Sequence, residues 1–146
     1  MDNLEAKILL AEDRMEDAHL THFALEEAGF VAMLHWVKNG EEALEYLKCE
    51  GVYKERSPIK PKMILMDLKM PKLDGIETLK IIKSDKRYLS IPVIMLTTSR
   101  EEVDRIRAIE NHANSYIVKP VDSEKFSQTV KALGEYWMER NFGVEG

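Results

Sequence analysis

Short apolar segments alternate along the chain with longer stretches of helical periodicity. The short segments are apolar at successive positions, as is typical of strands buried on both faces of a parallel sheet. The longer stretches repeat their apolar residues every three or four positions, which indicates amphipathic helices. This alternation predicts an α/β fold of five strand–helix pairs. The predicted strands cover residues 7–11, 33–37, 63–66, 92–97 and 115–118.

The predicted helix starts carry polar capping boxes, in which Asn, Asp or Ser is followed three residues later by Glu. Such a side chain accepts a hydrogen bond from a backbone N–H that has no partner within the helix. The boxes pair Asp13 with Glu16, Asn39 with Glu42, Asp74 with Glu77 and Ser99 with Glu102, and Asp122 alone is a candidate cap for the last helix.

Apolar stripes on the predicted helices indicate the faces that should pack on the sheet. Leu44 and Leu47 mark the second helix, while residues 50–61, with one Gly and two Pro, predict a surface loop after it. The fourth and fifth helices show longer stripes, formed by Val103, Ile106 and Ile109, and by Phe126, Val130, Leu133 and Trp137.

The bulk composition fits one soluble domain. The chain has 146 residues, of which 45% are hydrophobic and 32% charged, within the ordinary globular range. We expect a single domain over residues 1–146, with its core at about 7–138 and a loose tail at about 141–146. No apolar run approaches the roughly 20 residues of a membrane span, and no signal peptide is visible. With Cys49 as its only cysteine, the protein is expected in the cytoplasm.

The net charge of −5, with scattered basic residues, argues against nucleic acid as a direct partner. Any output is therefore expected to pass through other proteins.

Candidate chemistry lies at the carboxyl ends of the predicted strands, where doubly wound sheets bind their ligands. Glu12 and Asp13 follow the first strand, Asp67 the third and Lys119 the fifth, while Thr97 ends the fourth. With a flavodoxin-like strand order of 2-1-3-4-5, these side chains would meet at one edge of the sheet.

Such a cluster requires cations, because two carboxylates about 4 Å apart repel by roughly 4 kcal/mol at an effective dielectric constant near 20. Lys119 supplies one positive charge, and the hard oxygen ligands suit Mg²⁺. A carboxylate flanked by a dication and an ammonium is a competent nucleophile toward phosphorus. Asp67 is the predicted acceptor.

The same residues carry a family resemblance. The acidic pair Glu12-Asp13 is followed by an Asp-x-x-Met-Pro-x-x-Asp-Gly run over residues 67–75, then by Thr97, Tyr116 and a Lys-Pro pair at Lys119. Together, in this order, they resemble a CheY-like response-regulator receiver domain over about residues 7–138. The long loop before residue 63, the Leu-Thr-Thr-Ser run and the Glu-Tyr-Trp segment are further similar to the subgroup that serves cyanobacterial phytochromes.

The resemblance implies a role for each site residue. Asp67 would be phosphorylated, and Lys119 and Thr97 would contact phosphoryl oxygens. Tyr116 would rotate inward as the loop after Thr97 moves, which makes these two residues the switch. Mg²⁺ would be held by the side chains of Asp13 and Asp67, by the carbonyl of Lys69, and by Glu12 directly or through water.

The resemblance also implies the partners. The protein would be a stand-alone response regulator of a two-component phosphorelay, and a phosphoacceptor rather than an enzyme acting on other substrates. A histidine kinase, of phytochrome type in the narrower subgroup, or a histidine phosphotransfer protein would supply the phosphoryl group. An unidentified downstream protein would read the face of the fourth helix, fifth strand and fifth helix, through which the protein could also form a homodimer.

The sequence departs from the common receiver pattern in a few places. The side chain of Lys69, two residues after the acceptor, could contact the phosphoryl group or block attacking water. Ser115 stands where many receivers have Gly, which leaves Tyr116 less room. Asn111 and His112 replace another Gly near the end of the fourth helix, and both residue types tolerate a positive φ.

Simpler interpretations remain open for single residues. Asp74 could act only as a helix cap, Thr97 only as a strand residue, and Tyr116 only in packing. Three other functions compete: an interaction module that has lost phosphotransfer, a flavodoxin-like electron carrier and an aspartyl-phosphate phosphatase. The acidic segment 12–17 would repel a flavin phosphate, and Lys69 occupies the place where a phosphatase would carry its second acid.

Overall fold

The computed structural model of the chain describes residues 7–28 and 34–119, together with residues 124, 128 and 132. Five parallel strands form one sheet in the order β2-β1-β3-β4-β5, which confirms the predicted fold class and strand order. The strands are β1 (Ile8–Ala11), β2 (Leu34–Val37), β3 (Met63–Asp67), β4 (Val93–Thr97) and β5 (Ser115–Val118).

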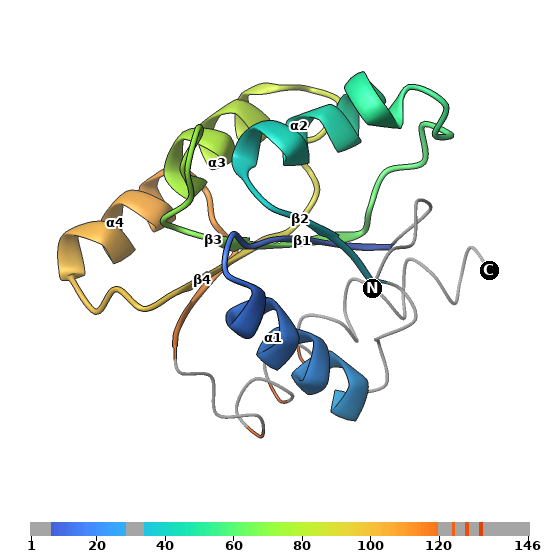
Figure 1. Cartoon of the computed structure of the whole chain (residues 1–146). Helices are drawn as coiled ribbons and strands as arrows, with labels where there is room; N and C mark the ends of the chain where they lie inside the picture. The colour runs from blue at the N-terminus through green and yellow to red at the C-terminus, as the bar shows by residue number, and fades with distance from the viewer. Residues whose placement is uncertain (1–6, 29–33, 120–123, 125–127, 129–131, 133–146) are drawn as a thin grey trace.

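Helices cover both faces of the sheet. Figure 1 shows α1 (Met15–Ala28) on one face and α2 (Gly40–Lys48) and α3 (Gly75–Ser84) on the other. The fourth helix, α4 (Glu102–Glu110), packs against α3 and β5. Residues 124, 128 and 132 of the predicted fifth helix are helical, whereas its apolar stripe, the Asp122 cap and the tail at 141–146 lie outside the described residues.

The core has two halves because successive side chains of a strand point to opposite faces of the sheet. In β1, Ile8 and Leu10 belong to the cluster on the α1 side, whereas Leu9 and Ala11 belong to the cluster beneath α2, α3 and α4. All four residues are fully buried. The sheet is therefore covered on both faces, and the carboxyl ends of its strands are left to form a site.

The predicted capping boxes are partly correct. Asn39 and Asp74 accept hydrogen bonds from the backbone N–H groups of the box glutamates, each at 2.8 Å, and begin α2 and α3. The prediction for Ser99 is wrong, because α4 begins three residues later and its capping residue, Glu101, makes no side-chain capping bond.

The apolar stripe of α4 does not lie in the core. Its residues Val103, Ile106 and Ile109 are between 42% and 57% exposed, and Ala108 is the one buried residue of this helix. The helix rests on the β4–β5 side of the sheet through this small side chain, so the three larger residues lie on its outer face. The end of the helix follows the prediction, because His112 adopts a φ of 71°.

Residues 50–61 were predicted as a surface loop, yet three of them, Tyr53, Arg56 and Pro61, are buried. Tyr53, which ends a short 3-10 turn named η2 (Gly51–Tyr53), is 7% exposed. Arg56 is 6% exposed, because its guanidinium donates to the carbonyl oxygens of Tyr46 and Ile59 and lies over the Tyr46 ring. The loop is therefore attached to α2 by one cation and one aromatic ring.

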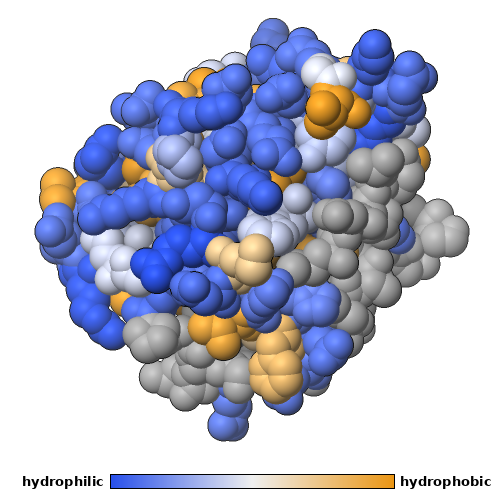
Figure 2. Space-filling view, viewed as in Figure 1, coloured by the Kyte–Doolittle hydropathy of each residue, from blue (hydrophilic) through white to orange (hydrophobic). Residues whose placement is uncertain are grey.

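Hydrophilic residues predominate on the face of the molecule shown in Figure 2, where the apolar residues form separate small spots. Within the described ranges, none of the helices combines the length and the apolar character needed to span a membrane.

Candidate functional site

Four strand ends bring the predicted site residues to one edge of the sheet. Asp67 is the last residue of β3, the central strand, and Thr97 is the last residue of β4. Glu12 directly follows β1, and Lys119 directly follows β5. The parallel registers pair Ala11 with Met66, Asp67 with Leu96, and Thr97 with Val118, so the four strands end at nearly the same level.

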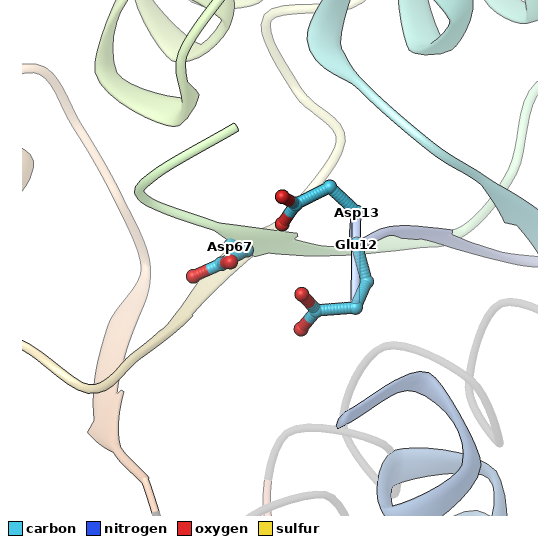
Figure 3. A group of neighbouring side chains, drawn as sticks. All are labelled: Glu12, Asp13 and Asp67. Carbon is cyan, nitrogen blue, oxygen red and sulfur yellow. The ribbon is translucent and has the colours of Figure 1, made fainter. Parts of the chain in front are cut away.

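Three carboxylates gather at this edge. Oxygen atoms of Glu12, Asp13 and Asp67 all lie within 4.8 Å of one another, and Figure 3 shows the three side chains grouped beyond the tips of β1 and β3. Glu12 is fully buried and Asp67 is 6% exposed, whereas Asp13 is exposed to solvent. The cluster is therefore closed by buried residues on one side and open to solvent on the side of Asp13.

A glycine fixes the start of α3 behind Asp67. A Cβ atom at Gly75 would lie 2.2 Å from the carbonyl oxygen of Asp67 and 2.8 Å from the Cα of Leu68. Because Gly75 has no side chain, its N–H donates to the carbonyl of Leu68 at 2.8 Å. Asp74 then caps the helix, so the capping interpretation accounts for this residue. The Asp-Gly pair turns the chain sharply and keeps the carboxylate end of β3 in place.

The ammonium group of Lys119 lies among the carboxylates. Its Nζ atom is 2.5 Å from Glu12 Oε1, 3.1 Å from Asp17 Oδ2 and 3.8 Å from Asp67 Oδ1. Lys119 is only 6% exposed. The backbone N–H of Lys119 donates to the carbonyl of Thr97 at 2.6 Å, which fixes the root of this side chain. One buried ammonium thus lies within 4 Å of the carboxylates of Glu12, Asp17 and Asp67.

Burial and charge act against each other on the pKa values of the site. Burial raises the pKa of Glu12 to about 7, although the hydrogen bond from Lys119 opposes this shift. Burial likewise raises the pKa of Asp67 above its usual value, against the charge of Lys119. Burial alone would lower the pKa of Lys119, but the hydrogen bond to Glu12 and the charge of Asp67 outweigh it and raise that pKa. The site therefore carries more negative charge than a single lysine compensates.

Backbone and indole groups hold Glu12 in place. Its N–H donates to the carbonyl of Val37 at 3.0 Å, and its own carbonyl accepts from the indole N–H of Trp36 at 2.7 Å. The carboxylate also accepts from the backbone N–H of Arg14 at 3.3 Å. Trp36 therefore contacts the backbone of the site.

The loop after Thr97 connects the site to Tyr116. The hydroxyl of Thr97, which is 1% exposed, accepts a hydrogen bond from the N–H of Ser99 at 3.1 Å. The carbonyl of Ser99 in turn accepts from the hydroxyl of Tyr116 at 3.2 Å. Tyr116 is half-buried and packs against the core cluster beneath α4. The two predicted switch residues are therefore joined through one intervening residue.

Lys69 and Asp17 differ from the other site residues in how far the sequence predicted their contacts. The side chain of Lys69 is exposed two residues after Asp67, and the proposed role of its carbonyl stays a prediction. Asp17, which the sequence analysis did not single out, contacts Lys119. Its place in the first turn of α1, a few residues after the acidic pair Glu12-Asp13, was the available signal.

Comparison with known proteins identifies the family. Residues 8–131 match the response regulator receiver domain, and the chain belongs to this family. It is 41% identical to the probable methanogenesis regulatory protein FilR2 of Methanothrix harundinacea, over 94% of this chain and 89% of that protein. It is 36% identical to the response regulator Rcp1 of Synechocystis, over 90% and 88% of the two chains.

Solved structures agree with this assignment. The bacteriophytochrome response regulator RtBRR superposes with a TM-score of 0.79 at 42% identity, over 87% of this chain and 76% of that one. The Mn²⁺-bound form of Rcp1 gives a TM-score of 0.72 at 33% identity, over 90% and 94%. The protein is thus a response-regulator receiver related to phytochrome response regulators, and it works in phosphorylation-based signalling with a histidine kinase as its implied partner.

Proposed function

We propose that Asp67 is the residue that accepts the phosphoryl group. The observation that carries this proposal is the position of its carboxylate, at the end of the central strand, beside Glu12 and Asp13 and 3.8 Å from the Lys119 ammonium. A carboxylate oxygen of Asp67 forms the bond to phosphorus while the bond from phosphorus to the donor's histidine nitrogen breaks. The imidazole leaves with its electron pair and takes up a proton, so the step balances.

The three carboxylates also fit a hard divalent ion, Mg²⁺ in particular. Oxygen ligands with an open, solvent-facing side are the donor set that Mg²⁺ takes while it keeps part of its water shell. Asp13, Asp67 and Glu12 would hold the ion with the carbonyl of Lys69, and the bound ion would neutralise charge on the phosphoryl oxygens. The related Rcp1 has been solved in a Mn²⁺-bound form, which supports a divalent site.

Lys119 and Thr97 are proposed to hold the phosphoryl group once it is on Asp67. Lys119 offers an ammonium that is buried and already oriented by its contact with Glu12. Thr97 uses its hydroxyl oxygen to accept from Ser99, which leaves the hydroxyl hydrogen to donate to a phosphoryl oxygen. A movement of Thr97 toward Asp67 would lengthen its bond with Ser99, whose carbonyl holds Tyr116. Tyr116 would then rotate inward, and the surface around α4 and β5 would change.

The remaining functional assignments belong to the same proposal. We propose a single receiver domain over residues 1–146 that acts in the cytoplasm without a nucleic-acid partner of its own. The phosphoryl donor would be a histidine kinase of phytochrome type, as the name of the bacteriophytochrome response regulator RtBRR suggests, or a histidine phosphotransfer protein. A downstream protein, or a second copy of this chain, would read the α4–β5 face together with the fifth helix.

Labelling by acetyl phosphate tests the assignment of Asp67. Intact mass spectrometry of the protein with Mg²⁺ should show one added phosphoryl group, which Asp67→Asn should abolish. Asp74→Asn is the matched control, because it removes an acid from the same loop while Asn can still cap α3. Stoichiometric labelling of Asp67→Asn, or loss of labelling in Asp74→Asn alone, would contradict the proposal.

A further inference from the structure

A fourth carboxylate, on α1, also contacts the ammonium of Lys119. Asp17 Oδ2 lies 3.1 Å from Lys119 Nζ, although the two residues are 102 positions apart in the chain. The side chain of Asp17 is 19% exposed. Asp17 does not belong to the acidic cluster of Glu12, Asp13 and Asp67. Its contact is with the lysine and not with the space where an ion would be held.

The three distances at Nζ show which carboxylates hold the lysine. Glu12 and Asp17, at 2.5 and 3.1 Å, are within hydrogen-bonding range, whereas Asp67, at 3.8 Å, is beyond it. An ammonium has three N–H donors, and here two of them are used by Glu12 and Asp17. Lys119 is therefore held on the α1 side of the site.

We propose that Asp17 is a positioning residue, which competes with Asp67 for the ammonium of Lys119 and keeps it off the acceptor carboxylate until phosphorylation. This inference rests on the proposed function of Asp67 and Lys119. Without a direct ammonium hydrogen bond, the lone pairs of the Asp67 carboxylate stay available for attack on phosphorus. After transfer, the phosphoryl group presents a larger negative charge than the carboxylate, and this charge draws the ammonium away from Asp17.

Removal of the Asp17 charge should let Lys119 pair with Asp67 before phosphorylation. That pairing stabilises the ground-state carboxylate and makes it a weaker nucleophile. The lost contact joins a buried ammonium to a half-buried carboxylate at the edge of the site. Lys119 keeps its contact with Glu12, so the expected effect is modest, roughly a fivefold slower phosphorylation.

The competing explanation is that Asp17 serves only the start of α1. It lies in the first turn of the helix, where acids are favoured by the helix dipole, and its Oδ2 atom is also 3.8 Å from Arg14 Nε. Glu16 provides a matched control on the same turn. Its side chain is 81% exposed and pairs with Arg14 at 3.5 Å, not with Lys119. Glu16→Gln therefore removes the same charge from the same turn without touching the lysine.

The test has two measurements. The first is the ¹⁵N NMR signal of the Lys119 ammonium in unphosphorylated protein, assigned by its loss in Lys119→Met. Asp17→Asn should shift this signal and speed its hydrogen exchange, whereas Glu16→Gln should leave it unchanged. The second is the rate of acetyl phosphate labelling with saturating Mg²⁺, which should fall roughly fivefold in Asp17→Asn, change less than about twofold in Glu16→Gln, and recover in part in Asp17→Glu.

An Asp17→Asn protein that matches Glu16→Gln in both measurements, or that is labelled faster than wild type, would overturn the inference. Asp17→Ser serves as a second variant should the Asn protein fold poorly. Failure of the proposed function is distinguishable, because it would appear as unlabelled wild type, while the NMR signal still reports the contact between Asp17 and Lys119.

Discussion

Replacement of Lys119 by Met, an unbranched apolar residue, should produce two effects of opposite sign. The substitution removes the buried cation that Glu12 and Asp67 share in the metal-free protein. Unit charges about 4 Å apart interact by roughly 4 kcal/mol at an effective dielectric constant of 20, and removal of one partner from a buried ion pair typically costs about 3–5 kcal/mol. We expect a loss near the lower limit, about 3 kcal/mol, because Asp13 keeps one side of the cluster open to water. Mg²⁺ affinity should rise, because the ion no longer meets an ammonium 3.8 Å from Asp67.

Urea unfolding in EDTA at pH 8 measures the first effect, and the fluorescence of Trp36 can follow Mg²⁺ binding, since its indole donates to the carbonyl of Glu12. Trp137→Phe in every protein of the series leaves Trp36 as the only tryptophan. Lys69→Met is the control, because it removes an exposed lysine close to Asp67 and should alter stability by less than about 0.5 kcal/mol. General damage to the fold would weaken stability and Mg²⁺ binding together. A stability loss below about 1 kcal/mol in Lys119→Met, or a weaker affinity for Mg²⁺, would refute the electrostatic reasoning.

Two further predictions concern regions away from the site. Arg56→Met should lower the free energy of unfolding, measured in urea, by about 2 kcal/mol, because the carbonyl of Tyr46 loses two charged donors. The loss in Arg56→Lys should lie between zero and the loss in Arg56→Met. A loss below about 0.5 kcal/mol in Arg56→Met would contradict the attachment of the loop. Hydrogen bonds from Arg87 lower the pKa of Asp85 to about 2, so this residue contributes stability above its unfolded pKa of about 4, and the contribution is lost as the pH falls through 2. NMR titration should locate this pKa, Arg87→Gln should return it toward 3.8, and equal values in both proteins would exclude the interaction.

The strand ends could be predicted because local sequence determines them. Runs of successive apolar residues define strands buried on both faces, so the polar residues that follow each run necessarily lie at the carboxyl edge of the sheet. Glu12, Asp67 and Lys119 were found in this way, and the structure brings their side chains together. The caps Asn39 and Asp74 were equally local, since the capping side chain and its backbone donor are three residues apart.

The errors concern side chains whose partners come from distant parts of the chain. The burial of Arg56 depends on carbonyls of α2 and of its own loop, and a charged residue near two prolines gives no sign of this. Ser99 fits the pattern of a cap, yet its hydroxyl donates to Asp104 at 2.6 Å and accepts from the N–H of Glu101. Asp17 faces Lys119 across 102 residues of sequence, so only the packing of α1 on the sheet reveals the pair.

The loop after Thr97, where the capping prediction for Ser99 was wrong, connects the proposed switch residues through Ser99. Ser99 uses its N–H toward Thr97, its carbonyl toward Tyr116 and its hydroxyl toward Asp104 of α4. Any displacement of Thr97 toward a phosphoryl group therefore acts on one residue that holds both the tyrosine ring and the first turn of the helix. The outer face of that helix carries the exposed stripe of Val103, Ile106 and Ile109. The loss of one hydrogen bond at Ser99 would thus shift an apolar surface. Burial of that surface by a partner protein contributes more free energy than the single hydrogen bond does. Ser99→Ala removes the hydroxyl bonds with Asp104 and with the N–H of Glu101 but keeps the backbone bonds to Thr97 and Tyr116, so it separates the movement of α4 from that of Tyr116.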